Sequence, residues 1–338
     1  MSAPELTLLI PGLFDAPSGM DGAGGEAAPG LARLLARADA QSTGDTGFEA
    51  ALFRLFGLAA GDASPVAPLT WLFDGSGAPV TGYWLRADPV HLRAGQDKVV
   101  MADAPPELMR EEAIELCGEI NAHFAGEGPH LIAPTGARWY LRLPQPPAVQ
   151  FTPLAAVRGQ DVHPHLPRGE DGRAWRRWLN EIQMLLHASA LNRERAARGQ
   201  PEINSVWFWG GGELPAAAAR RFTVVWGDDP LAGGLALNAG TAMRPLPADA
   251  SAWLAVAGEG RHLVVVTEWG GAWSGDPARR RQAIGALEAR WTGPLWSCLR
   301  AGRVAALTMG AGSGLDYHIT PKSARRWWRH ARPLTGYG

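Results

Sequence analysis

The sequence has few of the features that mark secreted, membrane or nucleic-acid-binding proteins. Its 338 residues include only two cysteines, Cys117 and Cys298, which are too far apart for a metal-binding pair and too few for a disulfide framework. The net charge of -1 provides no basic footprint for nucleic acid or an anionic membrane. No apolar run approaches the roughly 18 residues of a membrane span, and no basic stretch precedes the first apolar run. We therefore expect a soluble, cytoplasmic protein with no nucleic-acid or membrane partner.

Apolar side chains, and above all tryptophan, are plentiful. Hydrophobic residues make up 46% of the chain, which is ample for a sizeable core. The basic segment KSARRWWRHAR, residues 322–332, predicts an amphipathic helix that docks two tryptophans and extends its arginines into solvent. A surface for a protein partner is the alternative for this segment. Of the 15 tryptophans, the C-terminal part holds Trp269, Trp273, Trp291, Trp296, Trp327 and Trp328.

Continuous apolar runs alternate with segments whose apolar residues repeat at helical spacing. The first run, LTLLIP at Leu6–Pro11, is typical of a strand buried on both faces of a parallel sheet. A long helix is expected at Asp171–Gly199. Alternation of this kind predicts an α/β protein with a doubly wound, mainly parallel sheet. Further strands are expected at 67–73, 206–209, 222–226, 262–267 and 304–308, and helices at 29–38, 230–238, 250–257 and 276–299.

The middle of the chain has a different pattern. The stretch VTGYWLRADPVHLRAGQDKVVMAD predicts two or three short strands, and PPELMREEAIELCGEINAHF predicts a helix. Two more strands, HLIAP and ARWYLRLP, follow. Strands, helix and strands in this order indicate a small α+β domain inserted into the core. The predicted boundaries are 79–167 for this cap domain, and 1–78 with 168–338 for the core.

The stretch INSVWFWGGG, Ile203–Gly212, raises the question of a ligand-binding turn. It lacks the Gly-Lys-Ser/Thr of a P-loop and the spacing of a dinucleotide fingerprint. One interpretation is a central strand whose aromatic residues pack on both faces, with glycines where backbones approach closely. The other is that Gly210 and Gly211 line a pocket with their backbone N–H groups.

The string LNEIQMLLHASALNRERAARGQPEINSVWFWGGG resembles the archaeal-type, cofactor-independent phosphoglycerate mutases of the alkaline phosphatase superfamily. Asn192 and Arg195 match an Asn–x–x–Arg stretch of that family, and Asn204 with the following Trp207–Gly212 matches its asparagine and tryptophan–glycine strand. A divergent bacterial branch, variously labelled as mutase or regulatory protein, looks most similar. The resemblance implies an alkaline-phosphatase-like core with an inserted α+β cap.

The resemblance also implies chemistry that this sequence does not reproduce. The family uses a pair of divalent metals, Mn or Zn, held by Asp and His, and a nucleophilic serine. Here the first strand ends in Pro11-Gly12, the loop after Glu268 offers neither Asp nor His before Gly275-Asp276, and the last strand ends in Gly310-Ala311. We therefore expect a metal-free, non-catalytic binding or regulatory protein without catalytic residues. The alternative is an active mutase with displaced ligands and a Mn or Zn pair.

The candidate ligand site is a cleft between core and cap that takes a small, phosphorylated ligand. Arg86, Asp88 and His91 lie close together in the sequence and suggest an anion pocket, because arginine binds phosphate through two parallel hydrogen bonds. His163 and His165 form a His-x-His pair that could present two nitrogens to one metal ion, although a loop pair is the simpler interpretation. The remaining candidates are Asp15, Asn204, Gly210, Gly211 and Glu268.

Overall fold

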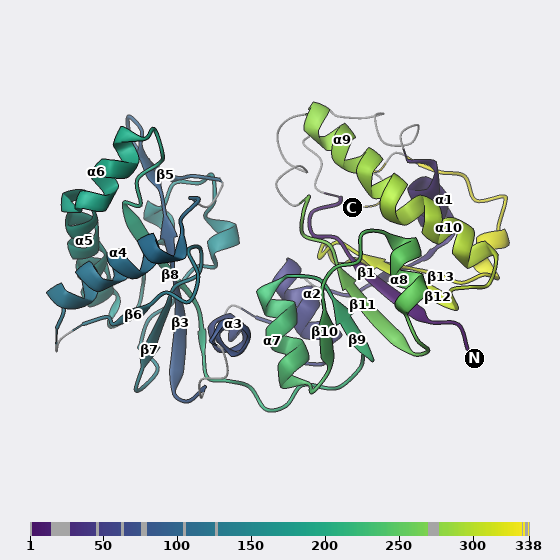
Figure 1. Cartoon of the computed structure of the whole chain (residues 1–338), viewed down its shortest axis with the longest axis horizontal. Helices are drawn as coiled ribbons and strands as arrows, with labels where there is room; N and C mark the ends of the chain where they lie inside the picture. Colours follow the sequence, from purple (N-terminus) through teal and green to yellow (C-terminus); the bar gives the residue numbers. More distant parts are fainter. Residues whose placement is uncertain are drawn as a thin grey trace. The chain divides into compact units, whose positions relative to one another are not determined.

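The computed structural model describes residues 2–14, 28–44, 47–61, 64–75, 80–103, 106–125, 128–269, 277–332, 334 and 337. Contacts divide the chain into a first unit, Met1–Ala60 with Ala217–Gly338, and a second unit, Gly61–Ala216 (Figure 1). The second unit is larger than the predicted cap at 79–167. It takes in the long helix and the tryptophan–glycine strand that the sequence pattern assigned to the core.

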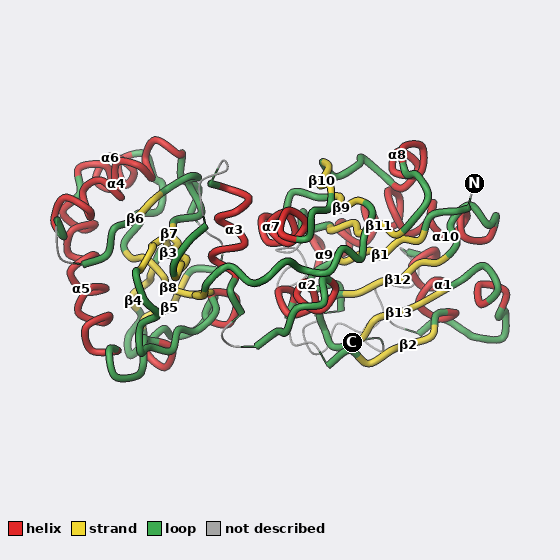
Figure 2. Tube along the Cα trace, turned by 90° about the horizontal axis from the view of Figure 1, so that it is seen from below, coloured by secondary structure: helices red, strands yellow, loops and turns green. Residues whose placement is uncertain are grey.

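The first unit contains a seven-stranded, mostly parallel sheet in the order β10-β9-β11-β1-β12-β13-β2 (Figure 2). The first five strands are parallel, while β13 pairs antiparallel with both β12 and β2. The predicted α/β class with a mainly parallel sheet is confirmed. The strands are β1 Glu5–Leu9, β2 Asp39–Ser42, β9 Val224–Trp226, β10 Ala242–Arg244, β11 Arg261–Val265, β12 Ala306–Gly310 and β13 Leu315–Ile319.

Both faces of this sheet are covered. Leu8 and Leu9 are neighbours in β1 and point to opposite faces, yet both are fully buried. One face packs against a cluster that includes side chains of α1, α8, α9 and α10. The helices of the unit are α1 Pro29–Arg37, α2 Phe48–Leu55, α7 Pro230–Asn238, α8 Ala250–Val256, α9 Pro277–Leu287 and α10 Gly293–Arg300.

A π-helical segment, Glu288–Thr292, joins α9 to α10 and supports the start of α1. The Glu288 carboxylate accepts hydrogen bonds from the backbone N–H groups of Gly30 at 2.7 Å and Leu31 at 3.0 Å. The N-cap residue before α1 is Ala28, whose side chain cannot cap the helix. The Glu288 carboxylate therefore takes the place of an N-cap side chain, and its negative charge interacts favourably with the positive end of the α1 dipole.

The second unit contains a four-stranded antiparallel sheet in the order β6-β7-β3-β8. The hairpin β4-β5 forms a separate sheet and follows β3 in the sequence. One side of the four-stranded sheet shares an apolar cluster with α4 and α5. None of the helices in the described part of the chain is long and apolar enough to cross a membrane. The strands are β3 Tyr83–Val90, β4 Leu92–Ala94, β5 Val99–Met101, β6 Leu131–Ile132, β7 Tyr140–Leu143 and β8 Ser205–Gly212, and the helices are α3 Val66–Asp74, α4 Arg110–His123, α5 Gly172–Ala188 and α6 Ala190–Ala197.

Three predictions in this unit differ from the structure. The segment 67–73 forms helix α3 instead of a strand, because a short, fully apolar run carries no periodicity that separates the two. The strand expected at 206–209 exists as β8, but it pairs antiparallel with β3 and does not belong to the parallel sheet. The predicted long helix breaks at Ser189, whose extended backbone separates α5 from α6.

The Asn–x–x–Arg stretch fastens α6 to the rest of the second unit. The Asn192 side chain donates to the carbonyls of Leu186 and Ile203 and accepts from the Ile203 N–H, all within 2.9 Å. Arg195, only 1% exposed, pairs with Glu112 of α4 at 2.8 Å and donates to the carbonyls of Glu107 and Pro201. These residues therefore connect α6 to α4 and to the chain entering β8.

The predicted C-terminal helix at 322–332 is also wrong. Only a short 3-10 turn, Ser323–Arg325, forms, and Trp327 and Trp328 are 75% and 60% exposed. The arginines on either side of the tryptophans are held instead by Asp39, at the start of β2. The tryptophans therefore do not dock on the core.

Replacing Arg195 with alanine should destabilise the second unit strongly, because the buried Glu112 carboxylate would keep only the half-exposed Arg198 as an ion-pair partner. We expect a loss of about 3–5 kcal/mol in the free energy of unfolding. The matched control is Arg177→Ala, which breaks the exposed pair with Glu181 in α5 and should cost less than about 1 kcal/mol. Urea denaturation followed by tryptophan fluorescence measures both, and equal losses would contradict this assignment.

Candidate functional site

In an open parallel sheet, ligands bind beyond the carboxyl ends of the strands, so the ends of β1, β11 and β12 are the first place to look. Beyond β1 lies the turn with Pro11 and Gly12, and Gly12 has a φ of 74° that favours glycine. Beyond β11, the predicted candidate Glu268 forms a 2.6 Å ion pair with Arg290, with both side chains about a third exposed. This carboxylate is therefore already engaged at the surface.

The end of β12 is closed by a side chain from its antiparallel neighbour. Gly310 lies opposite Asp316 of β13, and a Cβ built on Gly310 would lie 2.5 Å from the Asp316 carboxylate oxygen. Asp316 in turn pairs with Arg54 of α2 at 2.7 Å. Any side chain at position 310 would displace this carboxylate, so the glycine is required by the ion pair beside it.

The sequence pattern missed two carboxylates beyond β9, Asp228 and Asp229. Asp229 is the N-cap of α7 and accepts a hydrogen bond from the Ala232 N–H at 2.8 Å. Asp228 accepts from the Thr267 hydroxyl at 3.3 Å. Burial raises the pKa of Asp229 to about 6, the Ala232 N–H opposes that rise, and Glu49 and Asp228 add to it. The signal in the sequence was the Asp-Pro pair at the start of a helix, which indicates a cap rather than a ligand.

The described side chains at this edge include no set of ligands that fits a pair of divalent metals. Within the described ranges, no three His, Cys, Asp or Glu side chains are grouped as ligands. The carboxylates named above are bound to arginines, to a helix start or to a hydroxyl, and the strand ends carry no histidine. The candidate Asp15 lies outside the described residues.

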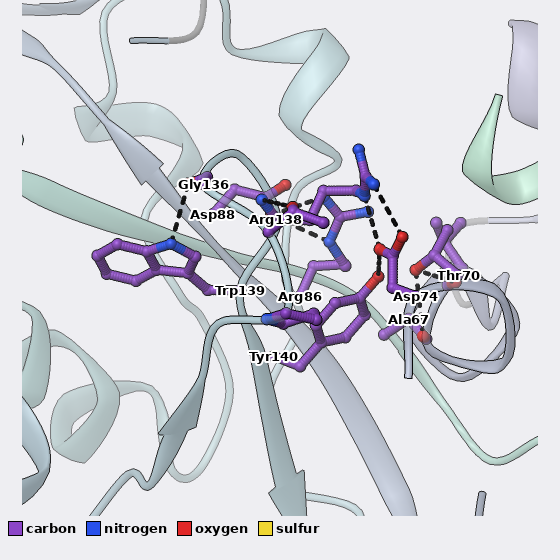
Figure 3. Close-up of polar contacts among 12 residues, drawn as sticks. Ala67, Thr70, Asp74, Arg86, Asp88, Gly136, Arg138, Trp139 and Tyr140 are labelled. Atoms are coloured by element: carbon purple, nitrogen blue, oxygen red, sulfur yellow. Dashed lines mark hydrogen bonds and ion pairs between the residues drawn. The ribbon is translucent and has the colours of Figure 1, made fainter. Parts of the chain in front are cut away.

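The predicted anion pocket at Arg86 and Asp88 is a buried ion pair (Figure 3). The Arg86 Nε and Nη2 atoms donate to Asp88 Oδ1 at 3.0 and 2.7 Å, and Trp209 Nε1 donates to Asp88 Oδ2 at 2.8 Å. The guanidinium also lies over the rings of Tyr140 and Trp209. Both charged side chains belong to β3, are at most 6% exposed and satisfy each other, so they do not form an open anion pocket. The hydrogen bond from Trp209 joins the pair to β8.

The same network continues to α3 (Figure 3). Asp74 accepts two hydrogen bonds from the Arg138 guanidinium, at 2.6 and 2.8 Å, and a third from the Tyr140 hydroxyl at 2.6 Å. Burial raises the pKa of Tyr140 above its usual range, which keeps the phenol protonated as the donor. This cluster holds α3 against the sheet.

His91 and Asn204 also have structural partners. His91 Nδ1 lies 2.8 Å from the Glu202 carbonyl oxygen. The Asn204 side chain accepts from the Leu92 N–H at 2.7 Å and donates to the Leu92 carbonyl at 2.8 Å. Its amide group therefore binds Leu92 as the backbone of a neighbouring strand residue would. Asn204 is nevertheless partly exposed to a cavity.

Two adjoining cavities in the second unit collect several of the remaining candidates. The first, of about 500 Å³, is lined by His163 and Asn204 together with Arg176, Asn180 and Gln183. The second, of about 470 Å³, is lined by Gly210, Gly211, Arg168, Thr152 and Tyr83. Leu166 lines both, so the loop around it divides one cavity from the other.

The second cavity owes its shape to a β-bulge at the glycines. Trp84 pairs with Gly212 and Arg86 with Trp209, so Gly210 and Gly211 together oppose a single residue of β3. Gly210 has a φ of 62°, and a Cβ on Gly211 would lie 2.5 Å from the Tyr83 hydroxyl. The aromatic residues are buried and the glycines line a cavity, but β8 lies at the edge of its sheet, so the predicted central position is wrong.

The structure separates the roles of His163 and His165. His163 Nδ1 lies 2.9 Å from Asp161 Oδ1, and this hydrogen bond lowers the pKa of the aspartate. His165 contributes its carbonyl, which accepts a hydrogen bond from the Thr152 hydroxyl at 3.2 Å. The first cavity is lined by His163, whereas His165 does not belong to either set of lining residues.

Comparison with known proteins gives a distant relationship. No family model matches the chain. A 2,3-bisphosphoglycerate-independent phosphoglycerate mutase from Methanothrix thermoacetophila is 33% identical over 76 residues, which are 22% of this chain and 19% of that protein. A probable mutase of the same description from Geobacter sulfurreducens is 33% identical over 63 residues, or 19% and 16% of the two chains. The chain is a distant homologue of the cofactor-independent phosphoglycerate mutases.

The similarity in sequence therefore spans less than a fifth of the length of these curated relatives. Among solved structures, the PH0037 protein from Pyrococcus horikoshii matches with a TM-score of 0.57 and 14% identity, over 95% of this chain and 88% of that one. A cofactor-independent phosphoglycerate mutase from Thermoplasma acidophilum matches with a TM-score of 0.46 and 16% identity, over 100% and 95%. These matches concern the fold.

The titration of Asp229 should be visible in the stability of the protein. Its pKa is raised from 3.8 to about 6 in the folded state, so its protonated form adds stability at low pH that is lost as the pH rises through 6. Relative to Asp229→Asn, the wild type should lose on the order of 2 kcal/mol of unfolding free energy between pH 4 and pH 7. Denaturant titrations at several pH values test this, and parallel pH profiles would contradict it.

Proposed function

We propose that this chain is a phosphoglycerate-mutase-like protein that binds a ligand and does not catalyse phosphoryl transfer. The observation that carries the proposal is the end of β12, where Gly310 leaves space for the Asp316–Arg54 ion pair. The resemblance implies an Asp-His pair of metal ligands at this strand end. Here that space is filled by a carboxylate whose charge is balanced inside the fold.

Charge balance supports the same conclusion. A phosphoryl group in transfer spreads negative charge over its oxygens, and catalysis requires cations placed against that charge. The Arg54 guanidinium is bonded to Asp316 and the Arg290 guanidinium to Glu268 and to the Ala248 carbonyl. These two arginines thus neutralise the protein's own carboxylates.

The cavities of the second unit are the proposed ligand site. Arg176 lines the first and donates to the Pro167 carbonyl at 2.5 Å, while Arg168 lines the second and donates to the Pro164 carbonyl. Each arginine retains further N–H groups for an anion, because a guanidinium has five donors. The bulged backbone at Gly210 and Gly211 suits a phosphate oxygen, which binds well to backbone N–H groups. The proposed ligand is a small phosphorylated compound.

The competing function is an active mutase whose metal ligands have moved. Such a site needs at least three convergent ligands. It would have to draw on Asp15 or on other carboxylates outside the described residues. Turnover separates the two functions directly.

Purified protein should not interconvert phosphoglycerate isomers in the presence of added Mn²⁺ or Zn²⁺. Coupled detection of product, with a relative of known activity as the positive control, measures this. Turnover that depends on added metal would remove the proposed function.

Ligand binding should appear as thermal stabilisation by inorganic phosphate and 3-phosphoglycerate. A ligand at about 100 times its Kd adds about 2.7 kcal/mol to the unfolding free energy. Arg168→Ala should abolish the shift, Arg168→Lys should keep part of it, and the exposed Arg177→Ala should leave it unchanged. A shift that survives Arg168→Ala would place the ligand elsewhere.

A further inference from the structure

Two adjacent tryptophans stand out on the surface of the first unit. Trp327 and Trp328 are 75% and 60% exposed, more than would be expected for the largest apolar side chain. Their rings make an edge-to-face contact, with centroids 6.2 Å apart and planes at 84°. Tryptophan together with arginine dominates the binding energy of protein interfaces, so this pair is a candidate anchor.

The arginines on either side of the pair are bound to residues next to and in β2. Arg326 and Arg329 both bind the Asp39 carboxylate, at 2.5 and 3.0 Å, and Arg329 also donates to the Ala38 carbonyl at 2.8 Å. Arg326 lowers the pKa of Asp39 most, and Arg329 adds to it. The chain is therefore attached to the first unit on both sides of the two tryptophans. Less binding free energy is then lost in ordering this segment when a partner binds.

The surface around the pair is positively charged. Arg37 donates to the Ala324 carbonyl at 2.8 Å and lies over the Trp296 ring, which Arg300 also approaches. Burial lowers the pKa of Arg37, and Arg300 and Arg33 lower it further, which shows that three guanidiniums lie near one another. In the described part of the chain, Asp39 is the one carboxylate that forms an ion pair with any of these arginines or with Arg325, Arg326 and Arg329. A chain of net charge -1 thus concentrates positive charge here.

We propose that Trp327 and Trp328, with Arg37, Arg325, Arg326 and Arg329, form a Trp–Arg surface that docks an acidic protein segment carrying apolar side chains. Charge complementarity selects the acidic segment and the tryptophans take its apolar side chains. The edge-to-face pair does not offer the parallel ring faces on which successive nucleotide bases stack. The segment is not an amphipathic helix of the kind that lies in a membrane surface. The proposal is independent of the cavities of the second unit.

Fluorescence anisotropy with a fluorescein-labelled peptide of repeated Asp-Glu-Leu-Phe tests the surface. The wild type should bind this peptide, and binding should weaken as salt rises. The double variant Trp327→Ala/Trp328→Ala should bind at least about tenfold more weakly, with an unchanged Tm because the rings are exposed. Leu237→Ala is the matched control, since Leu237 is a 50% exposed apolar residue of the same unit and should leave binding unchanged.

Asp39→Asn tests the positioning of the pair, because it removes the charge that fixes Arg326 and Arg329 but keeps both tryptophans. It should also weaken peptide binding, whereas a merely electrostatic surface would bind an acidic peptide more tightly once Asp39 is neutralised. Deleting the segment would be a poor test, because Ala324, Leu334 and Tyr337 belong to the core. Failure of the wild type to bind the peptide, or preference for a Lys-for-acid peptide, a dT oligonucleotide or phosphatidylserine vesicles, would overturn the proposal.

Discussion

A charge that leaves water must be paired, and this constraint organises both units of the protein. In the second unit, Arg195 with Glu112 and Arg138 with Asp74 each join elements distant in the sequence. The Arg86–Asp88 pair lies within β3 and is bound to β8 through Trp209. Removing one partner of such a pair costs several kcal/mol, because the other charge stays buried. Arg86 and Asp88, which the sequence suggested as an anion pocket, are therefore part of the contacts between two strands.

The same constraint shapes the edge of the parallel sheet. Asp316 and Arg54 satisfy each other beside Gly310, so this strand end needs no external cation to balance its carboxylate. The segment that carries the sequence resemblance to the mutases is likewise structural: Asn192 and Asn204 bind backbone groups, and Arg195 binds Glu112. A chain can retain these features as a distant homologue while the chemistry at the sheet edge changes. The ligand site that we propose is therefore the pair of adjoining cavities beside the glycine bulge.

Much of the first unit was predictable from the sequence. The apolar runs at β1 and β11 could be recognised as strands without knowing which strands they pair with, because a strand buried on both faces is mostly apolar. Helix α7 was predicted at its observed bounds, since Asp229 and Pro230 mark its start. The sheet that β8 joins and the helical conformation of α3 were not predictable, because a short apolar run does not reveal which sheet it joins or whether it is helical. Ion pairs such as Arg54–Asp316 span 262 residues, and no local pattern indicates them.

The central claim is that the fold balances its own charges where a mutase would hold a metal pair. The most direct test is the metal content of the purified full-length chain, measured by mass spectrometry after incubation with Mn²⁺ or Zn²⁺ and removal of the free metal. The account predicts less than one tightly held ion per chain and no rise in Tm on metal addition. Two ions per chain, retained through the exchange and accompanied by a higher Tm, would contradict it.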